Sequence, residues 1–179
     1  HTQPPGAVLT LYFLEEIFGD AAIVALAVML LALIPTIYFF YRLLSTEIEG
    51  DTAQYVTFLL VLLPAVEIYY LATIDAIIAA LLTATLYMFC FGKGGKAVAG
   101  AAVTLSGSFF LTFVSLFILP VLVGFELIVK RSVKRSAIVL GAVAAVHLLL
   151  YLFFGYNAVQ SFRTASQFEN PNGFMLFVE

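Results

Sequence analysis

Residues 21–43, AAIVALAVMLLALIPTIYFFYRL, contain no charged residue before Arg42 and decide which class of protein this is. A helix needs about 20 consecutive apolar residues to cross a hydrocarbon core about 30 Å thick, and this stretch has that length. The whole chain is similar in character, because 63% of its 179 residues are hydrophobic and 11% are charged. Soluble domains have about 45–50% apolar and about 25% charged residues. The sequence therefore predicts an all-α integral membrane protein.

The same criterion predicts a polytopic bundle of six transmembrane helices within residues 21–156. The expected spans are 21–43, 53–72, 74–91, 97–111, 112–129 and 137–156. Residues 97–129 are too long for one span, so we expect a turn near Gly107 and Ser108. Residues 6–18 are too few to cross a bilayer and carry Glu15 and Glu16. We therefore expect interfacial helices in the terminal segments 1–20 and 157–179.

The basic residues predict the orientation, because Lys and Arg are retained in short cytoplasmic loops. Seven of the eight fall on the side of loops 44–52, 92–96 and 130–136. They are Arg42, Lys93, Lys96, Lys130, Arg131, Lys134 and Arg135. Only Arg163 falls on the other side. We therefore expect these loops to be cytoplasmic and both terminal segments to lie outside the cell membrane.

Two carboxylates are expected at one outer corner of the bundle. Glu67 follows Pro64, which frees a backbone carbonyl and could open a cavity for it; contact with headgroups and water explains it equally well. Asp75 begins the next helix, where the helix dipole stabilises a carboxylate and Thr73 can serve as N-cap. Together the two acids could bind a divalent cation or a polar substrate.

Two further polar residues in apolar surroundings need an explanation. His147 is isolated within a span, where a hydrogen bond to a neighbouring helix is the simplest interpretation. Arg163 lies in the outer tail, where its planar guanidinium suits a phosphate. A side chain that extends to the bilayer surface is the alternative.

Several other classes of site find no basis in the sequence. The chain has a single cysteine, Cys90, and no His, Cys and Glu spacing typical of a metal site. It has no phosphate-binding glycine loop, and its composition does not favour nucleic-acid binding. Both ends look cut, so we expect this to be an internal piece of a larger protein.

Four stretches are similar to segments of the C-type membrane glycosyltransferases, in particular the protein O-mannosyltransferase-like branch. HTQPPGAVLTLYFLEEIFGD (1–20) resembles the His-Pro-Pro head that starts an outer helix in that family. LPAVEIYYLATIDAIIAALL (63–82) resembles its Pro-then-Asp pair of helices. LSGSFFLTFVSLFILPVLVGFEL (105–127) resembles its hairpin. FGYNAVQSFRTASQFENPNG (154–173) is similar to its later outer segment.

The resemblance implies transfer of a sugar from a polyprenyl-phosphate donor to an acceptor on the outer face. The residues expected around the lipid-phosphate cavity are His1, Pro4, Pro5, Glu67, Asp75 and Arg163. Five of them are implied by the resemblance, and Glu67 is added because it lies at the outer corner described above. The family's catalytic base lies upstream of the His-Pro-Pro head, so no catalytic residue is named within this chain. The alternative hypothesis is a non-enzymatic membrane module, either a transporter half or an assembly subunit, with an outer ion or lipid site.

Overall fold

The computed structural model describes residues 5–70 and 73–169, which form helices and no strands. The all-α prediction is confirmed. The elements are α1 (Pro5–Phe18), α2 (Ala21–Leu44), α3 (Gly50–Val61), α4 (Pro64–Tyr69), α5 (Ile74–Cys90), α6 (Gly94–Leu111), the 3-10 helix η1 (Phe113–Phe117), α7 (Ile118–Phe125), the π-helix η2 (Glu126–Lys130), α8 (Lys134–Phe154) and α9 (Ala158–Glu169).

Three helices are long and apolar enough to cross a membrane among the described residues. They are Ala21–Leu44, Phe113–Lys130, which joins η1, α7 and η2, and Lys134–Phe154. Helix α5 is a shorter apolar helix of 17 residues, or about 25 Å at 1.5 Å per residue. These helices support the prediction that the chain is a membrane protein. The six crossings and their orientation stay predictions.

The start of α2 shows how an apolar segment becomes a defined helix. Asp20 is the N-cap residue, and its carboxylate accepts hydrogen bonds from the backbone N–H of Ala22 at 2.8 Å and of Ile23 at 3.1 Å. These N–H groups have no partner inside the helix, so the cap stabilises its first turn. Beyond the cap, large apolar side chains such as Leu31 and Ile34 are exposed, which suits contact with lipid.

The segment predicted as one span at 53–72 is instead divided into α3 and α4. Pro64 occupies the first turn of α4, and Leu63 before it has the extended angles φ −67° and ψ 125°. A proline ring clashes with a preceding residue in the helical conformation, and its missing N–H removes a hydrogen bond. The chain therefore breaks at Leu63, and α3 with 12 residues is too short to span alone.

The turn expected near Gly107 and Ser108 is wrong, because α6 runs without a break to Leu111, the residue at which the expected span 97–111 ends. The break comes at Thr112, which is extended at φ −155° and ψ 146°. Its hydroxyl accepts a hydrogen bond from Val114 N–H at 3.2 Å and so caps η1. A hydrogen bond between the Ser108 and Ser115 hydroxyls then joins the two arms of this hairpin.

Helix α6 packs against α5 and α8 at the centre of the bundle. The buried core contains Phe89 of α5, Ala101 and Leu105 of α6, and Val139 of α8. Small residues allow these helices to approach closely. The hydroxyls of Thr85 and Thr104 form a hydrogen bond of 2.7 Å between α5 and α6. Because α6 faces other helices, it can carry small and polar residues that a lipid-facing helix would not.

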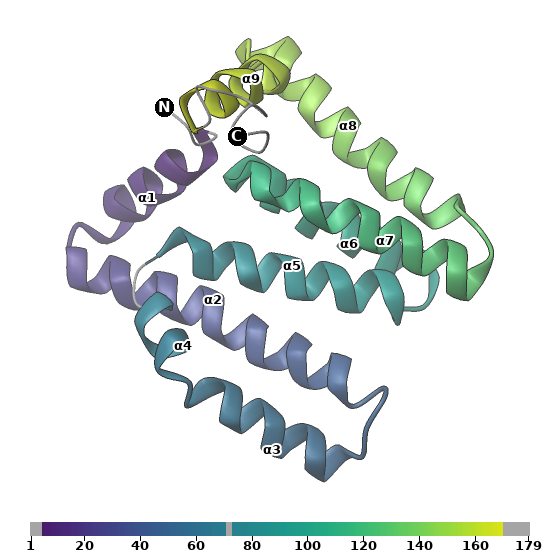
Figure 1. Cartoon of the computed structure of the whole chain (residues 1–179). Helices are drawn as coiled ribbons and strands as arrows, with labels where there is room; N and C mark the ends of the chain where they lie inside the picture. The colour runs from purple at the N-terminus through teal and green to yellow at the C-terminus, as the bar shows by residue number, and fades with distance from the viewer. Residues whose placement is uncertain (1–4, 71–72, 170–179) are drawn as a thin grey trace, which may run out of the picture.

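The long helices give the bundle two ends (Figure 1). At one end α2 and α5 finish and α6 and α8 begin, which brings the seven basic residues listed above to one end. We call this the basic end. At the opposite end α2 and α5 begin, α6 finishes and α8 leads into α9. We call this the α9 end, and α1 lies there, against α2 and α6.

Helix α1 is attached to the bundle where Gly6 meets the end of α6. A Cβ atom added at Gly6 would overlap the backbone carbonyl of Phe110, so only glycine allows this approach. We expect Gly6→Ala to displace α1 at a cost of about 1–3 kcal/mol, as overpacking does in well-packed cores. Faster proteolysis of α1 would be the measured result. Gly141→Ala, on α8 with nothing within 4 Å, is the control and should leave the rate unchanged; equal rates for both variants would contradict the contact.

Candidate functional site

The residues predicted around a lipid-phosphate cavity are spread along the chain. His1 and Pro4 lie outside the described residues. Pro5 is the first residue of α1 and Glu67 lies in α4, but the positions of both side chains also lie outside the described part. The chain does break next to Pro64, as the predicted kink requires. Whether Glu67 occupies a cavity there stays a prediction.

Asp75 and Arg163 are the two predicted site residues with described side chains. Asp75 lies in the first turn of α5, after the N-cap residue Thr73, and is exposed. Arg163 is exposed on α9. The start of α5 and the helix α9 lie at the same end of the bundle (Figure 1). Neither residue lines the pocket described next.

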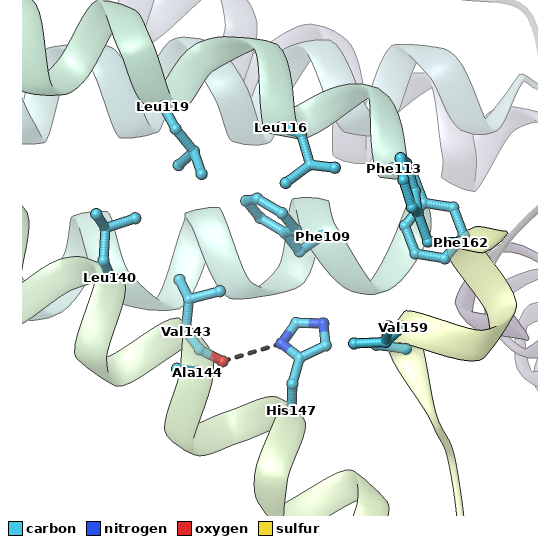
Figure 2. Close-up of a pocket in the computed structure, with 11 residues that line it drawn as sticks. Phe109, Phe113, Leu116, Leu119, Leu140, Val143, Ala144, His147, Val159 and Phe162 are labelled. Atoms are coloured by element: carbon cyan, nitrogen blue, oxygen red, sulfur yellow. Dashed lines mark hydrogen bonds between the residues drawn. The ribbon is translucent and has the colours of Figure 1, made fainter. Parts of the chain in front are cut away.

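A pocket of about 370 Å³ lies near the α9 end, between α6, η1, α7, α8 and α9. Figure 2 shows apolar side chains pointing into it from all of these elements. They include Phe109, Leu119, Val143, Ala144 and Phe162. Pockets of about 300–1,000 Å³ with apolar walls and few polar groups are typical ligand sites. This one lies among helices that are apolar enough to contact lipid.

His147 supplies the polar group of the pocket. Its Nδ1 lies 2.9 Å from the backbone oxygen of Val143, one turn earlier on α8. The partner predicted for this ring was a neighbouring helix, so that prediction is wrong. A carbonyl oxygen only accepts, so Nδ1 carries a proton, and Nε2 is an acceptor in the neutral ring. In Figure 2 the second nitrogen points into the pocket, and the edge-to-face partner of the ring is Phe109, with centroids 6.0 Å apart.

Helix α9 closes one side of the pocket through its apolar face. Phe162 meets Phe113 of η1 edge to face, with ring centroids 5.4 Å apart, and Val159 lies three residues earlier on the same face. Arg163 directly follows Phe162, so the helix that lines the pocket also carries the single basic residue outside the basic end. The spacing of Val159 and Phe162 within a polar segment indicates an apolar helix face from the sequence. Their place on the pocket wall opposite η1 does not follow from that spacing.

A second set of polar contacts lies at the basic end. The buried Glu126 carboxylate, 2% exposed, accepts hydrogen bonds from Arg135 N–H at 2.8 Å and from Ser136 N–H and hydroxyl, both at 2.6 Å. It therefore caps the start of α8 from the preceding helix. The hydrogen bonds of this carboxylate therefore go to the backbone of α8 and to the Ser136 hydroxyl.

The basic side chains of Lys130 and Arg135 bind the end of α5. Arg135 donates to the backbone oxygens of Phe89 at 2.6 Å and Gly92 at 2.7 Å. Lys130 donates to the Cys90 oxygen at 3.1 Å. The last carbonyls of a helix have no partner within it and carry partial negative charge, so cations stabilise them. This network joins the α5–α6 loop to the loop before α8.

Within the part of the chain that the structure describes, no group of three or more His, Cys, Asp and Glu side chains could hold a metal ion. A cation bound by Glu67 and Asp75 stays a prediction, because the Glu67 side chain is outside that part. Comparison with protein-family models, with curated proteins and with solved structures finds no match to this chain.

Proposed function

We propose that this chain forms part of a membrane glycosyltransferase that uses a polyprenyl-phosphate sugar as donor. The observation that carries the proposal is the apolar pocket near the α9 end, lined by the same helix that bears Arg163. The pocket would hold the first isoprene units of the donor. Arg163 would bind the phosphate just outside it.

The chemistry of the donor fits a site in which the pocket holds the isoprenoid chain and Arg163 binds the phosphate. An isoprenoid chain gains free energy when it leaves water for an apolar wall, by about 0.8 kcal/mol for each buried CH₂ group. Its phosphate stays charged and remains at the surface of the bundle. A guanidinium offers a planar pair of N–H donors that matches phosphate oxygens. When the sugar leaves, negative charge develops on the phosphate, and a cation held there stabilises it.

The acceptor must lose a proton, which requires a base within hydrogen-bond reach of its hydroxyl. The family resemblance assigns that base to a segment upstream of His1. Asp75, exposed at the same end of the bundle as Arg163, would border the site on the side of the acceptor. The experiments below therefore use the full-length protein.

The test measures donor binding and sugar transfer separately, in nanodiscs, with a panel of radiolabelled polyprenyl-phosphate sugars. Arg163→Ala is expected to weaken donor binding about tenfold, the usual cost of removing a charged hydrogen-bond donor. Arg163→Lys should be intermediate, because it keeps the charge and loses the paired geometry. Gln160→Ala, an exposed polar residue one turn earlier on α9, is the control and should bind the donor as wild type does.

Transfer distinguishes the enzyme from the alternative, a non-enzymatic membrane module with a lipid site. Binding of polyprenyl phosphate without transfer of any sugar in the panel would favour that module. If the protein neither binds polyprenyl phosphate nor transfers a sugar, the proposal is wrong. Transfer that is lost in Arg163→Ala and retained in Gln160→Ala would support the enzyme.

A further inference from the structure

The basic end carries an excess of positive charge that its own carboxylates do not balance. Seven basic residues lie at this end, and its acids are Glu126 and the exposed Glu47, Glu49 and Asp51 around the loop between α2 and α3. Between Asp75 and Glu169, Glu126 is the single acid beside six of these basic residues. Glu126 is buried and is occupied by the start of α8. Arg135 and Lys130 are occupied by carbonyls at the end of α5. The cations that remain are Lys93, Lys96, Arg131 and Lys134, all exposed.

These four exposed residues belong to one surface because the two loops that carry them are joined. Lys93 and Lys96 flank the start of α6, and Arg131 and Lys134 flank the start of α8. The bond from Arg135 to the Gly92 oxygen holds the residue next to Lys93 against the start of α8. We call the four residues the basic patch. No carboxylate partner of the patch is present among residues 5–70 and 73–169.

We propose that the basic patch binds the phosphate headgroups of anionic phospholipids. The patch flanks Phe113–Lys130 and Lys134–Phe154, two helices long and apolar enough to cross a membrane. Residues at the ends of such helices lie at the depth of the headgroups. Clusters of Lys and Arg at that depth attract anionic lipids through the negative charge of their headgroups. Charge and depth together select a lipid phosphate as the occupant.

The backbone at Arg131 supports a role for its side chain. Arg131 ends η2 in the left-handed conformation, at φ 48°. Glycine adopts this conformation without cost, whereas an L-residue with a long side chain is disfavoured there. The arginine at this position is exposed in the turn between η2 and α8. This site is at the end of the bundle opposite Arg163. The proposal that it binds lipid therefore does not depend on the proposed glycosyl transfer.

The test counts lipids bound to the detergent-purified full-length protein by native mass spectrometry. Dioleoyl phosphatidylglycerol is compared with dioleoyl phosphatidylcholine, which has the same chains and no net charge. Wild type is expected to prefer the anionic lipid about tenfold, since each basic residue near a membrane surface contributes to this attraction. The variant Lys93→Gln, Lys96→Gln, Arg131→Gln, Lys134→Gln should bind the two lipids equally. Raising the ammonium acetate concentration to about 1 M should weaken the preference.

The matched control keeps the charges and changes the side chains: Lys93→Arg, Lys96→Arg, Arg131→Lys, Lys134→Arg. It should retain the preference for phosphatidylglycerol. The paired variants Lys93→Gln, Lys96→Gln and Arg131→Gln, Lys134→Gln should each lose part of it, which covers the case in which the fourfold variant fails to fold. A wild type without preference, or paired glutamine variants that keep it in full, would overturn the proposal.

Discussion

Replacement of Glu126 by alanine is expected to destabilise the fold by about 3–5 kcal/mol, because it leaves buried donors of α8 without a partner. The carboxylate receives two backbone N–H groups and the Ser136 hydroxyl within 2.8 Å. Without it, the positive end of the α8 dipole loses its nearest anion. Glu126→Gln should cost less, because its amide oxygen can still accept from one donor while its NH₂ group faces another.

The free energy of unfolding can be measured by SDS titration in mixed micelles. Glu47→Ala removes an exposed carboxylate in the loop after α2 and should change that free energy by less than about 0.5 kcal/mol. Limited proteolysis of the loop between η2 and α8 should also accelerate in Glu126→Ala. A loss no greater than that of Glu47→Ala would mean that the network at the basic end does not stabilise α8.

The helices and their starts were predictable where the local sequence determines them. Long apolar segments must form helices in lipid, since every backbone polar group needs an internal partner there. Thr73 occupies the expected N-cap position of α5, although its side chain makes no capping hydrogen bond, and Asp75 is the expected first-turn acid. The gathering of seven basic residues at one end was also predictable, because it follows from counting crossings. The start of α5 depends on nearest neighbours along the chain, and the grouping of the basic residues depends on the direction in which each helix runs.

The features that were missed depend on contacts between distant residues. The break in 97–129 falls at Thr112 rather than at Gly107, because packing against α5 and α8 keeps the small residues of α6 helical. Pro64 is an exception, because its effect is local: it was expected to kink the helix, and it divides the span into α3 and α4. The role of Glu126 required knowledge that α8 begins beside it. The pocket required knowledge that α9 folds back over η1, which no local pattern specifies.

Filling the pocket should affect donor binding more than any other single change. Ala144 lines the pocket on α8, and a tryptophan there would occupy the space proposed for the first isoprene unit. Excluding five carbons at about 0.8 kcal/mol each costs about 4 kcal/mol, which weakens binding by the order of a hundredfold or more. The affinity for a polyprenyl phosphate, measured by scintillation proximity in nanodiscs, reports the loss.

Ala145→Trp is the matched control, because Ala145 is the next residue on α8, is also exposed and is not among the residues that line the pocket. Both substitutions add the same apolar surface to the same helix, so they perturb insertion and stability alike. A selective loss in Ala144→Trp would assign the isoprenoid to this pocket. Equal affinities would show that the chain of the donor lies elsewhere, and Arg163 would then act on a phosphate held by other contacts. Since His147 lies three residues beyond Ala144 on the pocket wall, its ring resonances should shift on binding in wild type and in Ala145→Trp, but not in Ala144→Trp.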